Sequence, residues 1–380
     1  MDNAGSLPPV TQAVAGVALW QCQGVDVPTD RWSGHRTVAA VLLSMSDAEL
    51  IAMLGRPDHG EGGIGGATQS IRVADTPVFV KLVRLTDRER RAGPACTANL
   101  FDLPIWYQYG VGEGSTGLNA WREVAAHQIV SDWVLDGACS NFPLLYHWRV
   151  LPRLAPETSA ATATDIDRAV QFWGDSPAVQ ARLRALDESS TVVALFLELL
   201  PFVLRDWLTE QLTAGSAEAE AAVTLVDQQL LGAVAHLRSA GMSHFDAHFT
   251  NVLTDGHQVY LSDFGLATAR RFQLSSAEQR FVRLTADHDL AYGAAALVNT
   301  IASTLVGFAD PRERNDYLRR CADNGRATAL AGTLADTVVR YAPAATVVND
   351  FYWQLHNGNL TAIYPADAIS TALRGAGVSA

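Results

Sequence analysis

Two aspartates and an asparagine follow one another at short intervals within residues 236–269, and their side chains suit the transfer of a phosphoryl group. Asn251 stands five residues after Asp246, and Asp263 opens the run Asp263-Phe-Gly265. Phosphoryl transfer needs a carboxylate that orients the attacking hydroxyl, together with neutralisation of charge around the phosphate. Asp246 is the candidate for the first task. Asn251 and Asp263 are the candidate Mg²⁺ ligands, because this ion prefers hard oxygen atoms.

The run from His244-Phe-Asp246 through Asn251 to Asp263-Phe-Gly265 resembles the catalytic-loop and DFG signature of the protein-kinase-like superfamily. A helical pattern precedes the run, and a short strand pattern at 259–262 separates its two parts, in the order of that signature. The resemblance implies an α+β, bilobal protein-kinase-like fold with a small antiparallel-sheet lobe and a larger helical lobe. It also implies a kinase that uses ATP and Mg²⁺ and transfers phosphate to an alcohol group.

The same resemblance gives roles to a glycine-rich run and a lysine further upstream. Gly60, Gly62 and Gly65 have the G-x-G-x-x-G spacing of a loop that covers nucleotide phosphates. Lys81, on the strand that follows, would hold the α- and β-phosphates. Residues 112–117 repeat the glycine spacing, but a kinase loop must precede the lysine strand. We therefore assign the nucleotide loop to the first run and interpret the second as a flexible loop.

Lys81 needs a carboxylate partner on the next helix, and the sequence offers two candidates. Glu123 lies in a long amphipathic pattern that begins after Asn119, a suitable N-cap, whereas Glu89 lies closer to the lysine in sequence. We favour Glu123, because a long helix of this kind is expected to pack on the sheet. The resemblance also places the link between the lobes at Glu198 to Leu200, where backbone groups would bind the adenine ring.

His248 stands two residues after Asp246, where many protein kinases have lysine. The resulting loop resembles that of aminoglycoside and choline-type phosphotransferases. Two roles are open for His248, a contact to the transferred phosphoryl group and the orientation of the loop, and we favour the second. Phe245 replaces the arginine that is common before the catalytic aspartate. Regulation through a phosphorylated loop that docks on that arginine is therefore disfavoured.

The nature of the acceptor stays open. The preferred prediction is an atypical bacterial-type Ser/Thr protein kinase that acts on a protein substrate, because Leu-Ser-Asp-Phe-Gly-Leu-Ala (261–267) reads like a protein kinase. The alternative is a small-molecule kinase of the aminoglycoside-phosphotransferase type. A pseudokinase is the third hypothesis, disfavoured because Lys81, Asp246, Asn251 and Asp263 are all present.

The elements that must position these residues change character near Pro201, from mixed strands and helices to mostly helices. We divide the chain into a predicted N-terminal extension that is loop-like up to residue 36 (1–55), an N-terminal lobe with the nucleotide loop and insertions (56–200), and a C-terminal helical lobe with the catalytic loop (201–380). The predicted elements are a hairpin (70–73 with 78–83), a buried strand (191–199), a helix (218–240) and two insertions (93–118 and 153–190). Ser275 is expected to cap a helix rather than to be phosphorylated.

Composition excludes several classes of protein. Of the 380 residues, 48% are hydrophobic and 18% are charged, which is typical of a globular chain with a substantial core. The net charge of −12 disfavours a general binder of nucleic acid. Four separated cysteines without a CxxC pair, and a start without a basic and apolar signal, lead us to expect a cytoplasmic protein. The uncharged stretch 290–309 is expected to be a buried core helix rather than a membrane span.

Overall fold

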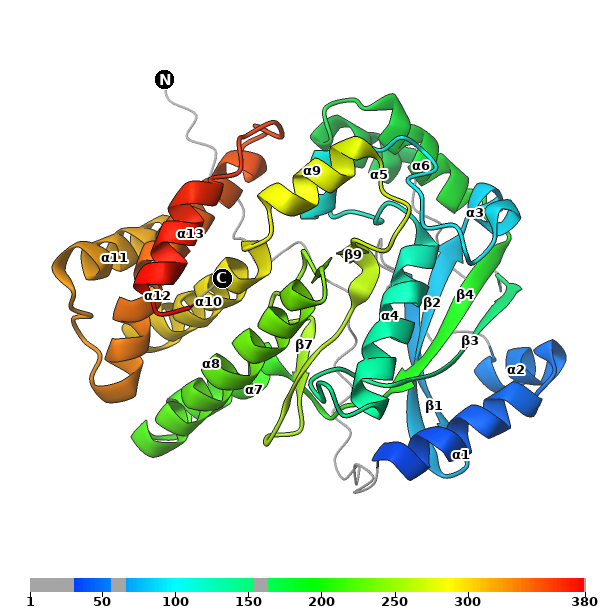
Figure 1. The fold of residues 1–380 in the computed structure, drawn as a ribbon, viewed down its shortest axis with the longest axis horizontal. Helices are drawn as coiled ribbons and strands as arrows, with labels where there is room; N and C mark the ends of the chain where they lie inside the picture. The colour runs from blue at the N-terminus through cyan, green and yellow to red at the C-terminus, as the bar shows by residue number, and fades with distance from the viewer. Residues whose placement is uncertain (1–30, 56–65, 154–162, 379–380) are drawn as a thin grey trace.

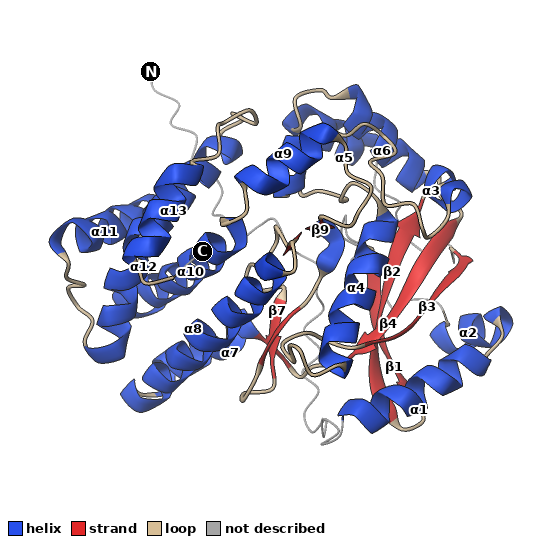
Figure 2. Cartoon of the chain, viewed as in Figure 1, coloured by secondary structure: helices blue, strands red, loops and turns tan. Residues whose placement is uncertain are grey.

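The computed structural model describes residues 31–55, 66–153 and 163–378 as a mixed α+β protein with a four-stranded antiparallel sheet and many helices (Figure 1 and Figure 2). The predicted hairpin is confirmed. β1 (Ala67–Val73) pairs with β2 (Thr76–Leu85) through a turn whose Ala74 and Asp75 both have positive φ, which suits the twist of a hairpin. β4 (Thr191–Glu198) pairs with β2, and β3 (Leu145–Pro152) completes the order β1-β2-β4-β3.

Helices cover both faces of the sheet, and the alternation of side chains along β4 decides which face each residue meets. One set of alternate residues packs with α1 (Arg31–Ser44) and α2 (Asp47–Leu54). The other set packs with α4 (Ala120–Leu135). The first set is Val192, Ala194 and Phe196, and the second is Val193, Leu195 and Leu197. Because both faces are buried, β4 has the continuous apolar sequence from which a buried strand was predicted.

Two elements of this part differ from the prediction. Residues 1–36 are predicted to be loop-like, but α1 begins at Arg31. This helix buries only Val38 and Leu42, so its sequence carries little apolar periodicity. β3 has no counterpart among the predicted elements. It lies at the edge of the sheet, mixes aromatic, basic and apolar residues, and is only partly buried, so it shows no clear alternation.

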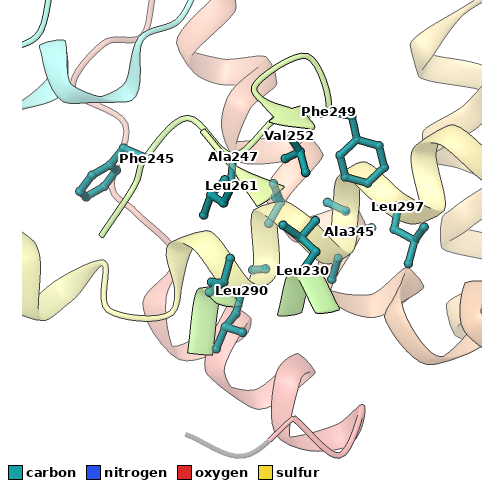
Figure 3. Packing of buried hydrophobic residues seen from close by; sticks show 14 of the residues in the cluster. Leu230, Phe245, Ala247, Phe249, Val252, Leu261, Leu290, Leu297 and Ala345 are labelled. Atoms are coloured by element: carbon teal, nitrogen blue, oxygen red, sulfur yellow. The ribbon is translucent and has the colours of Figure 1, made fainter. Parts of the chain in front are cut away.

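The described chain after Pro201 is mainly helical, as predicted (Figure 2). At its centre α8 (Ser216–Ser239), α10 (His288–Ile301) and α12 (Gly332–His356) pack against one another. Figure 3 shows how apolar side chains near the predicted catalytic loop, among them Ala247, Phe249 and Val252, gather with side chains of these helices. The remaining helices are α7 (Leu204–Ala214), α9 (Ser276–Leu284), α11 (Pro311–Asn324) and α13 (Ala366–Gly375).

The largest hydrophobic core crosses the predicted boundary at residue 200. It includes Tyr107 and Tyr109 of the short 3₁₀ helix η2 (Ile105–Tyr109), which lies in the first predicted insertion. The rest of that insertion is irregular, and the described part of the second contains α5 (Ala163–Phe172) and α6 (Pro177–Asp187). The three-part division of the chain stays a prediction, because side chains from both sides of residue 200 share one core.

Among the described residues, the helical stretch His288–Val306 is long and apolar enough to cross a membrane, and 56% of its apolar window is buried within the protein. The pair α1 and α2, which is bent by 114°, meets the same criterion only when joined. Leu290, Leu297 and Ile301 of α10 are buried in the large core. This burial agrees with the core helix predicted at 290–309.

Candidate active site

The alternation of side chains along β2 turns Lys81 toward α4, because its neighbours Val80 and Leu82 pack on the opposite face with α1 and α2. The Nζ atom of Lys81 lies 2.7 Å from Oε1 of Glu123 and 2.7 Å from Oδ1 of Asp263. Only 6% of Lys81 is exposed. Burial alone would lower the pKa of its ammonium group, but the two carboxylates outweigh burial and raise it. Lys81 is therefore a buried cation that joins β2, α4 and the turn of Asp263.

The choice of Glu123 over Glu89 as the partner of Lys81 agrees with the structure. Glu89 lies on α3 (Asp87–Ala92), where its carboxylate contacts Arg182 at 2.7 Å. The backbone amide of Ala120 also donates to Glu89 at 2.7 Å. Because Ala120 opens α4, Glu89 stabilises the N-terminus of the helix that carries Glu123. Asn119 is the N-cap of that helix, as predicted.

The turn at Asp263 has an unusual backbone. Asp263 has φ 59° and ψ 80°, a left-handed conformation that is uncommon for a residue other than glycine. Its Oδ1 atom accepts a hydrogen bond from the amide of Gly265 at 3.2 Å. Burial opposes ionisation of this carboxyl, but Lys81 and the Gly265 amide hold its pKa well below the usual range. Asp263 is therefore an anion at neutral pH, and Phe264 beside it is buried.

The predicted catalytic loop lies between β6 (Met242–Ser243) and β7 (Val252–Thr254), and it brings Asp246 and Asn251 together. The side-chain nitrogen of Asn251 donates to Oδ2 of Asp246 at 2.9 Å and to its backbone carbonyl at 3.1 Å. This pair fixes the carboxylate of Asp246, because both hydrogen bonds come from one amide group. The second strand of the region, β8 (Val259–Leu261), ends just before Asp263.

Asp289 holds the backbone of the same loop, and this role was not predicted from the sequence. Its two carboxylate oxygens accept hydrogen bonds from the backbone amides of His244 at 2.6 Å and Phe245 at 2.9 Å. The ring of His288 contacts Asp289 at 2.9 Å and the hydroxyl of Tyr352 at 2.6 Å. Asp289 is a charged residue at the start of an otherwise uncharged apolar helix. A charge in that position is the signal in the sequence that points to a buried polar role.

His248 contacts Asp246 in the way expected for an orienting residue. Its Nε2 atom lies 3.3 Å from Oδ1 of Asp246. Its Nδ1 atom forms a hydrogen bond with the hydroxyl of Thr250. The ring therefore links two parts of the loop. Its role in a reaction stays a prediction.

His127 is a further polar side chain near this cluster that was not anticipated. Its ring lies 5.1 Å from the ring of Phe264, in an edge-to-face arrangement. Neither ring nitrogen has a hydrogen-bond partner among the described residues. Burial lowers the pKa of His127 to about 3, so its ring is neutral at physiological pH.

The predicted adenine region lies at the end of β4, but the Glu198 side chain faces α1. Arg31 binds both carboxylate oxygens of Glu198, at 2.8 Å and 2.6 Å. The backbone amide of Leu144 also donates to this carboxylate at 3.1 Å. The Glu198 side chain is therefore occupied, and its backbone amide donates to the carbonyl of Leu144 at 2.8 Å. Leu200 is buried close by, and the adenine contact stays a prediction. The predicted loop residues Gly60, Gly62 and Gly65 lie outside the described residues.

The side chains present fit a magnesium ion that has few protein ligands. Lys81 and the Gly265 amide both contact Oδ1 of Asp263, which leaves Oδ2 available on a side chain that is 38% exposed. Asn251 uses its nitrogen on Asp246, which leaves its amide oxygen available. In the described part of the chain, no group of three or more His, Cys, Asp or Glu residues has the geometry of a metal site. An ion at Asp263 and Asn251 would therefore take its other ligands from phosphate and water.

The fold thus forms two groups of predicted site residues, Lys81 with Glu123 and Asp263, and Asp246 with His248 and Asn251. The groups adjoin, because the amide of Ser262, next to Asp263, donates to the carbonyl of Asn251 at 2.9 Å. No protein-family model and no curated protein matches this chain. The function is therefore inferred from the arrangement of its own residues.

Proposed function

We propose that this chain is an ATP- and Mg²⁺-dependent phosphotransferase with a bilobal protein-kinase-like fold. The observation that carries the proposal is the position of Lys81, whose Nζ atom contacts both Glu123 and Asp263 at 2.7 Å. A buried lysine between a helix glutamate and a metal-binding aspartate is the arrangement that phosphoryl transfer by kinases requires. The pairing of Asp246 with Asn251 supports the same reaction.

Each residue of the site has a task in the proposed reaction. Lys81 binds phosphate oxygens of ATP and is itself held by Glu123. Asp246 accepts the proton of the attacking hydroxyl and orients its oxygen toward the γ-phosphate. Asn251 and Asp263 hold Mg²⁺, which neutralises charge on the phosphate oxygens when bound. The backbone from Glu198 to Leu200 binds the adenine ring.

The acceptor that we propose first is a Ser or Thr hydroxyl of a protein substrate. A small-molecule hydroxyl is the second candidate, and a specific observation favours it. The sequence of the loop, with His248 two residues after Asp246, resembles that of the small-molecule phosphotransferases, and His248 contacts Asp246 at 3.3 Å. In addition, the segment between Gly265 and Asp287 is short and contains α9, which begins in a capping box, so it gives a peptide substrate little surface on which to dock.

Labelled ATP and Mg²⁺, incubated with the purified chain and a lysate, separate these acceptors. A labelled protein band that disappears in Asp263→Ala supports a protein kinase. Label in the small-molecule fraction, with the same dependence on Asp263, supports the second candidate. Nucleotide binding without transfer to either fraction would contradict the proposed activity and identify a pseudokinase.

A further inference from the structure

The segment between β2 and α4, residues 86–119, packs directly on the turn that contains Asp263. The side-chain nitrogen of Gln108 donates a hydrogen bond to the backbone carbonyl of Leu266. Gly117 lies so close that a Cβ atom there would be 2.3 Å from the carbonyl oxygen of Gly265. Gly110 approaches the side chain of Leu266 in the same way. The second glycine run is therefore a loop, as predicted, but a tightly packed one.

This segment is anchored at several points, so it can act as a fixed support. Asn119 donates to the carbonyls of Cys96 at 3.0 Å and Ala98 at 2.8 Å. The indole nitrogen of Trp173 donates to the carbonyl of Gly114 at 2.9 Å. The first two bonds join the middle of the segment to Asn119, the N-cap of α4, and the third joins its C-terminal part to Trp173, which follows α5.

The same support reaches the chain that follows the turn. Arg122 of α4 forms a buried ion pair with Glu278 of α9 at 2.6 Å and donates to the carbonyl of Thr97 at 2.7 Å. The hydroxyl of Thr97 accepts a hydrogen bond from the amide of Gln273 at 2.8 Å. A cavity of about 10 Å³ lies between Gln108, Arg122 and Glu278. Residues 86–119 therefore contact the chain after Asp263 at Gly265, Leu266 and Gln273.

We propose that residues 86–119 are a positioning element for Asp263, with Gln108 and Gly117 as its contact residues. The inference rests on the proposed function and adds a device that fixes the metal-binding aspartate. Asp263 has a left-handed backbone, and such a conformation persists only when the surroundings hold it. Gln108 is a positioning residue because it touches neither Asp263 nor the reacting groups. It acts through the carbonyl of Leu266.

A pair of glycine substitutions tests this inference. Gly117→Ala and Gly137→Ala both place alanine at positive φ, 66° and 72° respectively, and so carry similar backbone strain. Only Gly117→Ala introduces an atom against Gly265, because no heavy atom lies within 4 Å of the Cβ position at Gly137. The measurement is hydrogen–deuterium exchange of the peptide at residues 261–268. We expect exchange in Gly117→Ala to be faster by about tenfold or more, and exchange in Gly137→Ala to match the wild type.

Gln108→Met keeps the side-chain volume and removes the donor, so it decides the matter if Gly117→Ala does not fold. We expect faster exchange at 261–268, a higher Mg²⁺ concentration for half-maximal activity, and unchanged nucleotide affinity in the presence of EDTA. Exchange at 261–268 equal to the wild type in Gln108→Met would overturn the inference. The exchange measurement needs no substrate, so it decides the positioning role even if the wild-type chain transfers no phosphate and the proposed function fails.

Discussion

Phe245 and Asp263 are non-glycine residues with a left-handed backbone, and each such conformation costs about 1–3 kcal/mol. Phe245 lies next to Asp246, and Asp263 belongs to the candidate site itself. Asp289 offsets the strain at Phe245, because it accepts the amides of Phe245 and His244. Lys81 and the Gly265 amide do the same for Asp263. The strained backbone positions therefore occur at or beside Asp246 and Asp263, the two carboxylates whose orientation matters for the proposed reaction.

The first prediction concerns Asp246. Asp246→Ala removes the carboxylate that we propose accepts the hydroxyl proton, so we expect turnover to fall by about a hundredfold to ten-thousandfold. Nucleotide binding should persist, because the proposed phosphate and adenine contacts come from other residues. Steady-state kinetics with a nucleotide-binding assay measures both quantities. Asp323→Ala, at an exposed position of α11, is the control. Turnover of Asp246→Ala within about tenfold of the wild type would show that the role is assigned to the wrong residue.

The second prediction concerns His248. Its ring links Asp246 and Thr250, and lysine accepts no hydrogen bond and has no fixed ring geometry. We therefore expect His248→Lys to lose about tenfold or more in turnover. His257→Lys, at an exposed position beyond β7, should leave turnover unchanged. Near wild-type turnover in His248→Lys would instead support a phosphoryl-contacting cation and a protein-kinase type of loop.

At the scale of elements, the third prediction concerns the start of α9. Ser275 caps this helix in a capping box with Glu278, which agrees with the capping role predicted from the sequence. Ser275→Ala should reduce the free energy of unfolding by about 1 kcal/mol, and Ser276→Ala should change it little. Urea denaturation of the two variants measures the difference. Equal stability of both variants would mean that the cap contributes nothing in the folded protein.

The local sequence pattern was enough to predict those elements that are determined by their own side chains. The hairpin of β1 and β2, the Asn119 cap and the choice of Glu123 all follow from alternation, capping chemistry or helical period. The role of Asp289 could not be predicted in this way, because it depends on contacts across more than forty residues of chain. The pairing of Arg31 with Glu198 joins residues that are 167 positions apart. Such contacts can be identified only from the folded structure.

At the scale of the molecule, the fourth prediction concerns the contact by which α1 is attached to the end of β4. Arg31 binds Glu198 and also donates to the carbonyls of Ser140 and Phe142. Arg31→Ala leaves the carboxylate of Glu198 buried without this cation, so we expect a loss of about 3 kcal/mol in unfolding free energy. Nucleotide affinity should fall as well, because the proposed adenine region adjoins Glu198.

Thermal and chemical denaturation, with a nucleotide titration, measure both effects of Arg31→Ala. Arg36→Ala on the same helix is the control, because Arg36 lies over the ring of the half-exposed Trp32. We expect Arg36→Ala to change stability by less than about 0.5 kcal/mol. If the two variants lose the same stability and both bind nucleotide as tightly as the wild type, α1 is only a cover for the sheet and does not support the nucleotide region.

Because both faces of the sheet are buried, the face to which the Lys81 side chain points depends on whether its position along β2 is odd or even. Odd-numbered residues of β2, such as Phe79 and Val83, face α4, and even-numbered ones, such as Val80, face α1 and α2. One residue inserted between Thr76 and Lys81 would turn the lysine into the apolar layer under α1, away from Glu123. Two inserted residues would restore its direction. Over evolutionary time, length changes in this strand are therefore expected to be tolerated only in pairs.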